Sequence, residues 1–248
     1  MKTISIGNQS FSSIREKNYF YIDKTDFIRE WWEGDDTVTL ITRPRRFGKT
    51  LNMDMLNCFF SKNYEGRKDL FEGLSIWDEM DNNREYIYRQ LQGTYPVIFV
   101  SFADVKENTF TETYQRLCCT ITHLYNENRF LTDGDFLTEA ERKQFLSVNY
   151  GMNKTIVTDS LRTLCRYLFR YYGKKVILLM DEYDTPLQEA YVNGYWDEMV
   201  HFLSSMFNAT FKTNPYLERG LMTGITRISK ESMFSGLNNL EVVTTTSH

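Results

Sequence analysis

The segment Thr37-Val-Thr-Leu-Ile-Thr-Arg-Pro-Arg-Arg-Phe-Gly-Lys-Thr50 joins two different hydrophobic patterns. Its first six residues are mostly β-branched or apolar, which favours a β-strand over Thr37–Thr42. From Lys49 to Phe60 the apolar residues recur at helical spacing, which predicts an α-helix. The residues between them therefore form a loop that leads from a strand into a helix.

This loop ends in Gly48-Lys49-Thr50, as does the phosphate-binding Walker A motif G-x-x-x-x-G-K-[ST]. Backbone N–H groups at a helix N-terminus form an anion cradle, which the helix dipole strengthens. Lys49 would contact the β- and γ-phosphates of ATP and act in catalysis, and the Thr50 hydroxyl would bind Mg²⁺. Arg43 stands where the motif has a glycine, whose usual conformation a Cβ atom resists. A solvated basic loop that caps a helix is the alternative. We predict nucleotide contacts from the whole loop: Arg43, Pro44, Arg45, Arg46, Phe47, Gly48, Lys49 and Thr50.

A second stretch, Val176-Ile-Leu-Leu-Met-Asp-Glu182, is an apolar run that ends in two carboxylates, which is the Walker B pattern. In a parallel α/β sheet, ligands bind at the carboxyl ends of the strands, so these acids and the loop are expected at the same edge. Asp181 would bind Mg²⁺ and contact the nucleotide, and Glu182 would orient and deprotonate the attacking water. Asp184 follows on the adjoining turn. Its alternative role is an acidic N-cap for the helix after Pro186.

A third candidate element is the predicted strand Leu221–Ile228, expected next to the acidic strand. Thr223 or Thr226 could contact the γ-phosphate or the attacking water, and we predict a nucleotide contact from Thr226. Arg227 could stabilise charge in the transition state as a catalytic residue. The alternative is structural, because threonine suits strands and Arg227 could form an ion pair.

The rest of the chain alternates strand-like and helical patterns, so we predict one α/β domain over residues 1–248. Its fold would be a three-layer P-loop NTPase with a mainly parallel central sheet. Thr138 and Glu141 have capping-box spacing, and Gly173 stands at a helix end. We expect further strands at Pro96–Phe102 and Leu240–Thr246, helices at Thr109–Tyr125, Thr155–Tyr172 and Tyr195–Ala209, and irregular helical insertions at Phe71–Gly93 and Arg129–Asn153.

The composition is that of an ordinary globular protein, with 42% hydrophobic and 25% charged residues and a formal net charge of −4. This charge provides no overall electrostatic attraction to nucleic acid, so direct nucleic-acid binding is not predicted. The longest strongly apolar run, Val176–Met180, is far too short for a membrane span, and no signal peptide is recognisable. We predict a cytoplasmic protein. Its four cysteines fall in helical apolar patterns and are expected to be reduced core thiols: Cys58, Cys118, Cys119 and Cys165.

Taken together, these motifs resemble the bacterial AAA-ATPase-like family, whose members often carry a C-terminal PD-(D/E)XK nuclease-like domain. In that family Arg-Pro-Arg-Arg-Phe-Gly-Lys is the usual phosphate loop, which accounts for Arg43. The resemblance implies an ATP site with the roles given above, and it places Tyr21-Ile-Asp-Lys-Thr25 near the nucleotide edge. From the residues alone, that segment is a structural, strand-like stretch before a helix capped near Thr25. The other segments that carry the resemblance are Phe11-Ser-Ser-Ile-Arg15, Leu70-Phe-Glu-Gly-Leu74, Asp181-Glu-Tyr-Asp-Thr-Pro186, Gly224-Ile-Thr-Arg227 and Phe234-Ser-Gly-Leu-Asn-Asn239.

The predicted function is an ATPase whose hydrolysis drives a conformational switch in a larger protein. The alternative is a nucleotide-gated scaffold that binds protein or DNA and hydrolyses little ATP; a small-molecule kinase is weaker, because no acceptor pocket can be recognised. Family members usually continue into a helical lid and the nuclease-like domain. We therefore expect the chain to be an N-terminal fragment whose partner is that missing domain or another protein. A nucleotide-dependent oligomer, with Arg227 acting in trans, is a further expectation.

Overall fold

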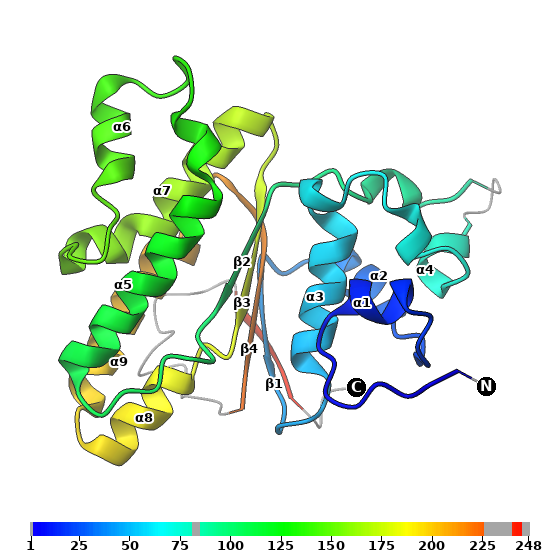
Figure 1. The fold of residues 1–248 in the computed structure, drawn as a ribbon, viewed down its shortest axis with the longest axis horizontal. Helices are drawn as coiled ribbons and strands as arrows, with labels where there is room; N and C mark the ends of the chain where they lie inside the picture. Colours follow the sequence, from blue (N-terminus) through cyan, green and yellow to red (C-terminus); the bar gives the residue numbers. More distant parts are fainter. Residues whose placement is uncertain (1, 81–84, 226–239, 245–248) are drawn as a thin grey trace. The chain divides into compact units, whose positions relative to one another are not determined.

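The computed structural model describes residues 2–80, 85–225 and 240–244. Its strands form one parallel sheet in the order β2-β3-β4-β1-β5 (Figure 1). The predicted α/β class and parallel sheet are thereby confirmed, and the succession of elements is consistent with the three-layer P-loop NTPase-like fold. The strands are β1 Val38–Thr42, β2 Val97–Ser101, β3 Val176–Asp181, β4 Leu217–Gly224 and β5 Leu240–Val243.

The register of the sheet aligns the carboxyl ends of three strands. Thr42 at the end of β1 pairs with Gly224 of β4, and Met180 near the end of β3 pairs with Met222 of β4. Because β4 lies between β1 and β3, and neighbouring strands lie about 4.8 Å apart, the ends of β1 and β3 are separated by roughly 10 Å. The strand predicted next to the acidic strand is therefore β4.

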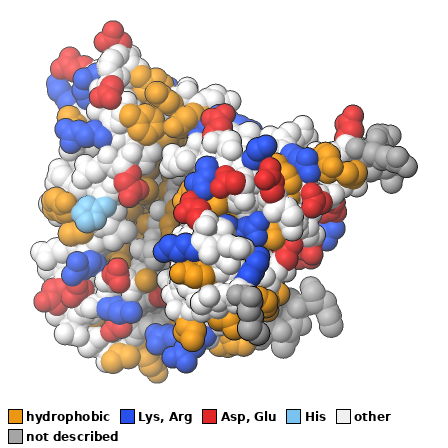
Figure 2. Space-filling model, turned by 45° about the vertical axis from the view of Figure 1, so that its right-hand side comes forward, with side chains coloured by type: hydrophobic (Ala, Val, Ile, Leu, Met, Phe, Trp, Pro, Cys, Tyr) orange, Lys and Arg blue, Asp and Glu red, His pale blue; other side chains and the backbone are white. Residues whose placement is uncertain are grey.

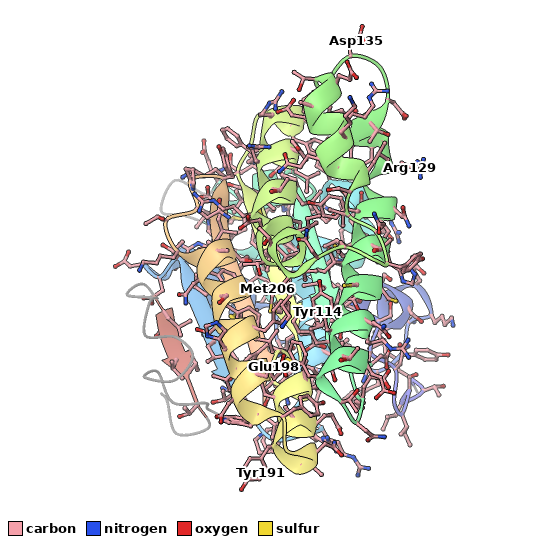
Figure 3. The ribbon with its side chains drawn as sticks, turned by 90° about the vertical axis from the view of Figure 1, so that its left-hand side faces the viewer. Tyr114, Arg129, Asp135, Tyr191, Glu198 and Met206 are labelled. Atoms are coloured by element: carbon pink, nitrogen blue, oxygen red, sulfur yellow. The ribbon has the colours of Figure 1, made fainter. Side chains whose placement is uncertain are left out.

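The chain divides into two compact units, of which the second comprises Thr37–Pro44 and Ile98–His248 and contains nearly all of the sheet. Its helices cover one face of that sheet, as Figure 3 shows, with Met206 and Tyr114 labelled on two of them. β3 is buried along its whole length, as its continuous apolar sequence predicts. The helices of this unit are α5 Phe110–Glu127, α6 Glu139–Leu146, α7 Lys154–Tyr172, α8 Thr185–Asn193 and α9 Trp196–Phe211, with a 3₁₀ turn at Arg129–Thr132.

Local sequence signals account for most of these boundaries. The predicted capping box between Thr138 and Glu141 begins α6, and Gly173, with φ of 65°, ends α7 in the left-handed conformation that glycine favours. β4 begins at Leu217, four residues before the predicted Leu221 (221 − 217). Pairing with β3 draws polar residues such as Arg219 into the strand, so sheet context overrides their weak strand preference.

The first unit comprises Met1–Asp36 and Arg45–Val97. Its motif segments pack against one another: the ring of Phe11 stacks on that of Phe71 at 5.1 Å, and Arg15 Nε donates to the Leu70 carbonyl at 2.7 Å. The Phe11 amide donates to Asp54 Oδ2 at 2.7 Å, which ties this cluster to the helix after the loop. The helices are α1 Phe11–Glu16, α2 Asp26–Glu33, α3 Lys49–Phe60 and α4 Ser75–Asp78, with 3₁₀ turns at Lys62–Tyr64, Lys68–Leu70 and Arg89–Leu91.

The segment Tyr21–Thr25 is irregular, so the strand-like interpretation was wrong. Its polar side chains are used inside the first unit: Asp23 Oδ1 accepts from the Thr25 amide at 2.9 Å, and Asp23 Oδ2 accepts from the Ser75 amide at 2.7 Å. The buried Thr25 hydroxyl accepts from the Ile76 amide at 3.2 Å. These bonds join the starts of α2 and α4, as the structural interpretation of this segment requires.

The predicted insertions contain short helices, as expected: α4 in the first unit, and α6 with a 3₁₀ turn in the second. Cys58, Cys118 and Cys165 are buried free thiols, whereas Cys119 is half-buried. Within the described ranges, none of the helices combines the length and the apolar character that crossing a bilayer requires.

Candidate functional site

The last residue of β3 and the three residues after it, Asp181–Asp184, form a tight turn that we call the acidic turn. Asp181 is 2% exposed, and its Oδ1 accepts a hydrogen bond from the Thr223 hydroxyl on β4. The Tyr183 amide donates to the Thr223 carbonyl at 3.0 Å, and the Phe102 amide after β2 donates to the Asp181 carbonyl at 3.0 Å. The turn is thus fixed to the strands on both sides of β3.

Glu182 has a left-handed backbone, with φ of 50°. This conformation costs a non-glycine residue roughly 1–2 kcal/mol, and such strain is concentrated at functional sites. Thr185 compensates in part, because its hydroxyl donates to Glu182 Oε2 at 3.1 Å and its amide donates to the Glu182 carbonyl at 3.1 Å. The half-buried carboxylate is therefore held at the start of α8.

Asp184 does not use its side chain to cap α8, so that alternative is wrong. Its carboxylate is almost completely buried, with 1% of the residue exposed, and Oδ2 accepts from the Ile225 amide at 2.9 Å. Ile225 is the first residue after β4. Sequence reasoning missed this contact and the one between Thr185 and Glu182. The nearest expectation from the sequence was a helix after Pro186, and it indicated neither contact.

Thr223 is 1% exposed, and its hydroxyl is directed to Asp181. Of the predicted residues that follow β4, Thr226 and Arg227 lie outside the described residues, as does the segment Phe234–Asn239. Their predicted roles as nucleotide contact and catalytic arginine remain predictions.

The end of β1 joins this sheet edge through Arg43, whose amide donates to the Gly224 carbonyl at 3.2 Å. The described non-glycine residues with positive φ are Asn18, Arg46, Glu182 and Thr213, so Arg43 has an ordinary backbone conformation. The concern that this position requires glycine therefore does not apply. Arg43 and the exposed Pro44 belong to the second unit, together with the acidic turn.

The remaining residues of the predicted phosphate loop belong to the first unit, where Arg45–Gly48 precede α3 and Lys49 and Thr50 form its start. The helix begins at Lys49, as predicted, and the Asn52 amide donates to the Gly48 carbonyl at 3.0 Å. Arg46 and Gly48 have left-handed backbones, with φ of 70° and 74°. Alternation of left- and right-handed residues turns successive N–H groups toward one side, which is the geometry of an anion-binding nest.

The side chains of this loop are presented to solvent. Arg45, Arg46 and Phe47 are exposed, and 54% of the Phe47 surface is accessible. Within the described parts of the chain, no hydrogen bond or ion pair involves the Arg45 or Arg46 guanidinium. Two unpaired cations beside a helix N-terminus are suited to an anionic ligand.

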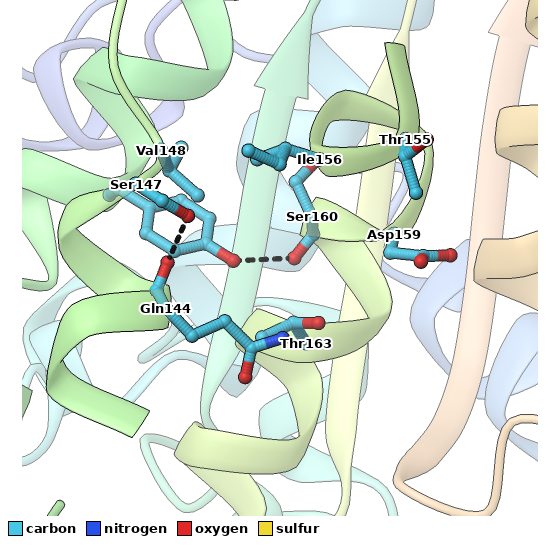
Figure 4. A pocket seen from close by; sticks show the side chains of 9 residues that line it. Gln144, Ser147, Val148, Thr155, Ile156, Asp159, Ser160 and Thr163 are labelled. Carbon is cyan, nitrogen blue, oxygen red and sulfur yellow. Dashed lines mark hydrogen bonds between the residues drawn. The ribbon is translucent and has the colours of Figure 1, made fainter. Parts of the chain in front are cut away.

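Other parts of the molecule offer weaker candidates for a binding site. Figure 2 shows Lys and Arg side chains interspersed with Asp and Glu over the face in view. A cavity of about 140 Å³ in the second unit contains no predicted site residue (Figure 4). Two of its polar groups bond to the backbone, with the Ser147 hydroxyl donating to the Gln144 carbonyl and Tyr125 to the Ser160 carbonyl. The lining residues are Tyr125, Gln144, Ser147, Val148, Thr155, Ile156, Asp159, Ser160 and Thr163.

In the parallel sheet, β3 ends in an acidic residue, and β1 leads into Gly-Lys-Thr at the start of a helix. One strand, β4, lies between β1 and β3. These features together define a protein of the P-loop NTPase-like class. Within this class, the chain belongs to the AAA-ATPase-like family, described as "Predicted AAA-ATPase", whose model matches residues 5–234. The resemblance deduced from the motifs is thereby confirmed. Membership in this family supports nucleotide binding and an ATPase-like function in general.

Among curated proteins, the chain is similar to the "Uncharacterized protein in vnfD 5'region" of Azotobacter chroococcum mcd 1. The two are 28% identical over 242 residues, which cover 97% of this chain and 40% of that relative. The chain therefore spans well under half the length of the curated relative. No solved structure matches it.

Proposed function

We propose that this chain binds ATP with Mg²⁺ and hydrolyses it, and that hydrolysis drives a conformational switch in a larger protein. The observation that carries the proposal is the acidic turn, which holds Asp181 and the Glu182 carboxylate at the carboxyl edge of the sheet. This is the edge at which β1 ends and from which the chain continues into the phosphate loop.

The phosphate loop supplies the anion-binding half. Backbone N–H groups at the start of α3 face the phosphates, and Lys49 contacts the β- and γ-phosphates. Arg45 and Arg46, whose guanidinium groups have no partner in the described parts of the chain, add positive charge around the triphosphate. Phe47 is exposed and sits in the same loop, where its ring is available to the nucleotide.

The donor set suits Mg²⁺, which takes oxygen ligands and is usually bound by one or two carboxylates together with substrate phosphates. Among the described residues no group of three or more His, Cys, Asp or Glu side chains is arranged to hold a metal by itself, so a site that needs the phosphates fits better than a closed protein cage. Thr50 would supply a hydroxyl and Asp181 a carboxylate. The ion would neutralise charge on the β- and γ-phosphates.

Glu182 acts on the attacking water. Its carboxylate accepts a proton from this water while Thr185 holds the other side of the group in place. Asp181 keeps its orientation through the Thr223 hydroxyl. Thr226 and Arg227 remain the proposed contact and charge-stabilising residues on the chain that continues from β4.

The proposed switch acts on a part of the protein beyond the family domain. In support, the matched region makes up only 40% of the curated relative. A C-terminal nuclease-like domain or a protein partner is the proposed recipient, and assembly in the presence of nucleotide is part of the same proposal.

Phosphate release from ATP tests this function. Wild type is compared with Lys49→Ala and Glu182→Gln, and the matched controls are Lys143→Ala and Glu139→Gln, an exposed pair on α6. We expect Glu182→Gln to reduce turnover by roughly 10²–10⁴-fold while ATP still binds, and Lys49→Ala to weaken binding. Equal rates in wild type and both site variants would defeat the ATPase. Tight ATP binding without turnover, also in the full-length protein, would select the nucleotide-gated scaffold.

A further inference from the structure

Asp184 connects the acidic turn to the chain that leaves β4. Three consecutive links join these two segments: the Thr223 hydroxyl donates to Asp181 Oδ1, the Tyr183 amide donates to the Thr223 carbonyl, and the Ile225 amide donates to Asp184 Oδ2 at 2.9 Å. The first joins the ends of β3 and β4, and the second joins the turn after β3 to Thr223 of β4. The third reaches Ile225, the first residue after β4.

The Asp184 side chain would have different hydrogen-bond partners if its role were only to cap the start of α8. An N-cap carboxylate accepts from the amides of the first helical turn, but here only the backbone carbonyl of Asp184 does so, from Leu187 and Gln188. The carboxylate is instead buried, which costs free energy unless it is hydrogen-bonded. Its contact with the Ile225 amide is the charge-assisted type of hydrogen bond that offsets such a cost.

Gly224 makes room for this contact. A Cβ atom at this position would lie 2.7 Å from Asp184 Oδ1 and 2.5 Å from the Tyr183 ring, closer than real Cβ atoms come. The glycine in Gly224-Ile-Thr-Arg227 is therefore explained by the close approach of the Asp184 carboxylate. Two segments that are 40 residues apart in the sequence (224 − 184) are therefore sterically complementary at Asp184 and Gly224.

We infer that Asp184 is a positioning residue that fixes the direction in which the chain leaves β4 relative to Asp181 and Glu182. This inference rests on the proposed function, because Asp181 and Glu182 are the groups that would respond to the nucleotide. A displacement of the acidic turn on nucleotide binding or hydrolysis is passed through the Asp184 carboxylate to the backbone of Ile225. Asp184 itself takes no part in the chemistry.

The test measures amide hydrogen exchange at Ile225 by NMR, together with ATP affinity and turnover, in the full chain. The variants are Asp184→Ala, Asp184→Asn and Gly224→Ala, with Asp197→Ala as an exposed control on α9. We expect Asp184→Ala to speed exchange at Ile225 and to lower turnover, each by roughly 10-fold or more, with ATP affinity within about twofold of wild type. Asn retains an acceptor oxygen, so Asp184→Asn should restore most of the protection and turnover, whereas Gly224→Ala should resemble Asp184→Ala.

Unchanged exchange at Ile225 in Asp184→Ala would overturn the inference, and so would equal losses of turnover in Asp184→Ala and Asp184→Asn. If wild type does not hydrolyse ATP, the proposed function fails separately. Coupling is then read from the change in Ile225 exchange on adding ATP-Mg²⁺, which should occur in wild type and be lost in Asp184→Ala. Melting temperatures identify a variant that is merely unfolded. If Asp184→Ala is unfolded, the exchange and turnover of Asp184→Asn decide whether the positioning role of Asp184 is supported or rejected.

Discussion

The phosphate loop and the acidic turn each hold a non-glycine residue with a left-handed backbone, Arg46 at φ of 70° and Glu182 at φ of 50°, but the two residues have opposite surroundings. Arg46 is exposed, and its guanidinium has no partner in the described parts of the chain. Glu182 is half-buried, and Thr185 donates to its carboxylate. The strain is similar, roughly 1–2 kcal/mol each, but a side-chain contact accompanies it only at Glu182.

This difference indicates a division of labour. The acidic turn is organised by the protein itself, through bonds from Thr223, Thr185 and Ile225. The phosphate loop instead presents the exposed Arg45 and Arg46 guanidinium groups, which have no partner in the described parts of the chain and are suited to an anionic ligand. We therefore expect substitutions in the turn to change stability and turnover together, whereas substitutions in the loop should change ligand affinity and leave stability nearly unaffected.

The largest effect is expected from removing the two proposed Mg²⁺ ligands, one in each region. Asp181→Ala should lower turnover by roughly 100-fold or more and destabilise the protein by about 1–3 kcal/mol, because it leaves the buried Thr223 hydroxyl without its acceptor. Thr50→Ala should also lower Mg²⁺-dependent turnover, but with little loss of stability, because alanine favours a helix. A titration of turnover with Mg²⁺ measures the loss of activity in each variant, and urea unfolding measures the loss of stability. Equal stability losses in both variants would contradict the division of labour.

The next effect concerns the exposed arginines. Arg45→Ala and Arg46→Ala should each weaken ATP binding by roughly 10-fold, and the loss should shrink at high salt because both groups are exposed. Arg46→Gly should weaken binding equally but be about 1 kcal/mol more stable than Arg46→Ala, because glycine accepts the left-handed backbone. Calorimetric titration at two salt concentrations measures the affinity, with exposed Arg129→Ala as control. If both alanine variants bind ATP with wild-type affinity, Arg45 and Arg46 do not contribute to ATP binding.

The sequence was sufficient where a signal is local. α3 runs from Lys49 to Phe60, as predicted, because Gly48 precedes it and a continuous apolar face defines it. β3 and the capping box of α6 follow from equally local patterns. β4 was predicted four residues short (221 − 217), because its first residues are placed by pairing with β3 and not by their own preference.

The candidate site was predictable in its residues but not in its contacts. An apolar run that ends in two acids identifies Asp181 and Glu182, since strand ends meet at one edge of a parallel sheet. The partner of Asp184 is Ile225, 41 residues away (225 − 184), and it depends on the strand order that brings β4 beside β3. A capping role was the natural expectation from local spacing. The structure replaces it with a contact that only the assembled sheet creates.

The smallest expected effect concerns Asp54, a half-buried acid of α3 one turn beyond Thr50. Burial raises the pKa of Asp54 above its ordinary value, despite the bond from the Phe11 amide. Because the folded pKa lies above the unfolded one, the folded state favours the protonated form, and stability falls as pH rises through the raised pKa. Asp54→Asn keeps an acceptor for the Phe11 amide and cannot ionise. Its unfolding free energy relative to wild type should therefore increase between acid and neutral pH.

Asp69 provides a control of opposite sign. The hydrogen bond from Arg67 lowers the pKa of Asp69, so its contribution to stability is present above the unfolded pKa and is lost as pH falls. That contribution is small, because the pair is exposed. Urea unfolding of wild type, Asp54→Asn and Asp69→Asn across this pH range should give differences of opposite slope. A parallel pH dependence for wild type and Asp54→Asn would mean that burial does not raise the pKa of Asp54 in the folded protein.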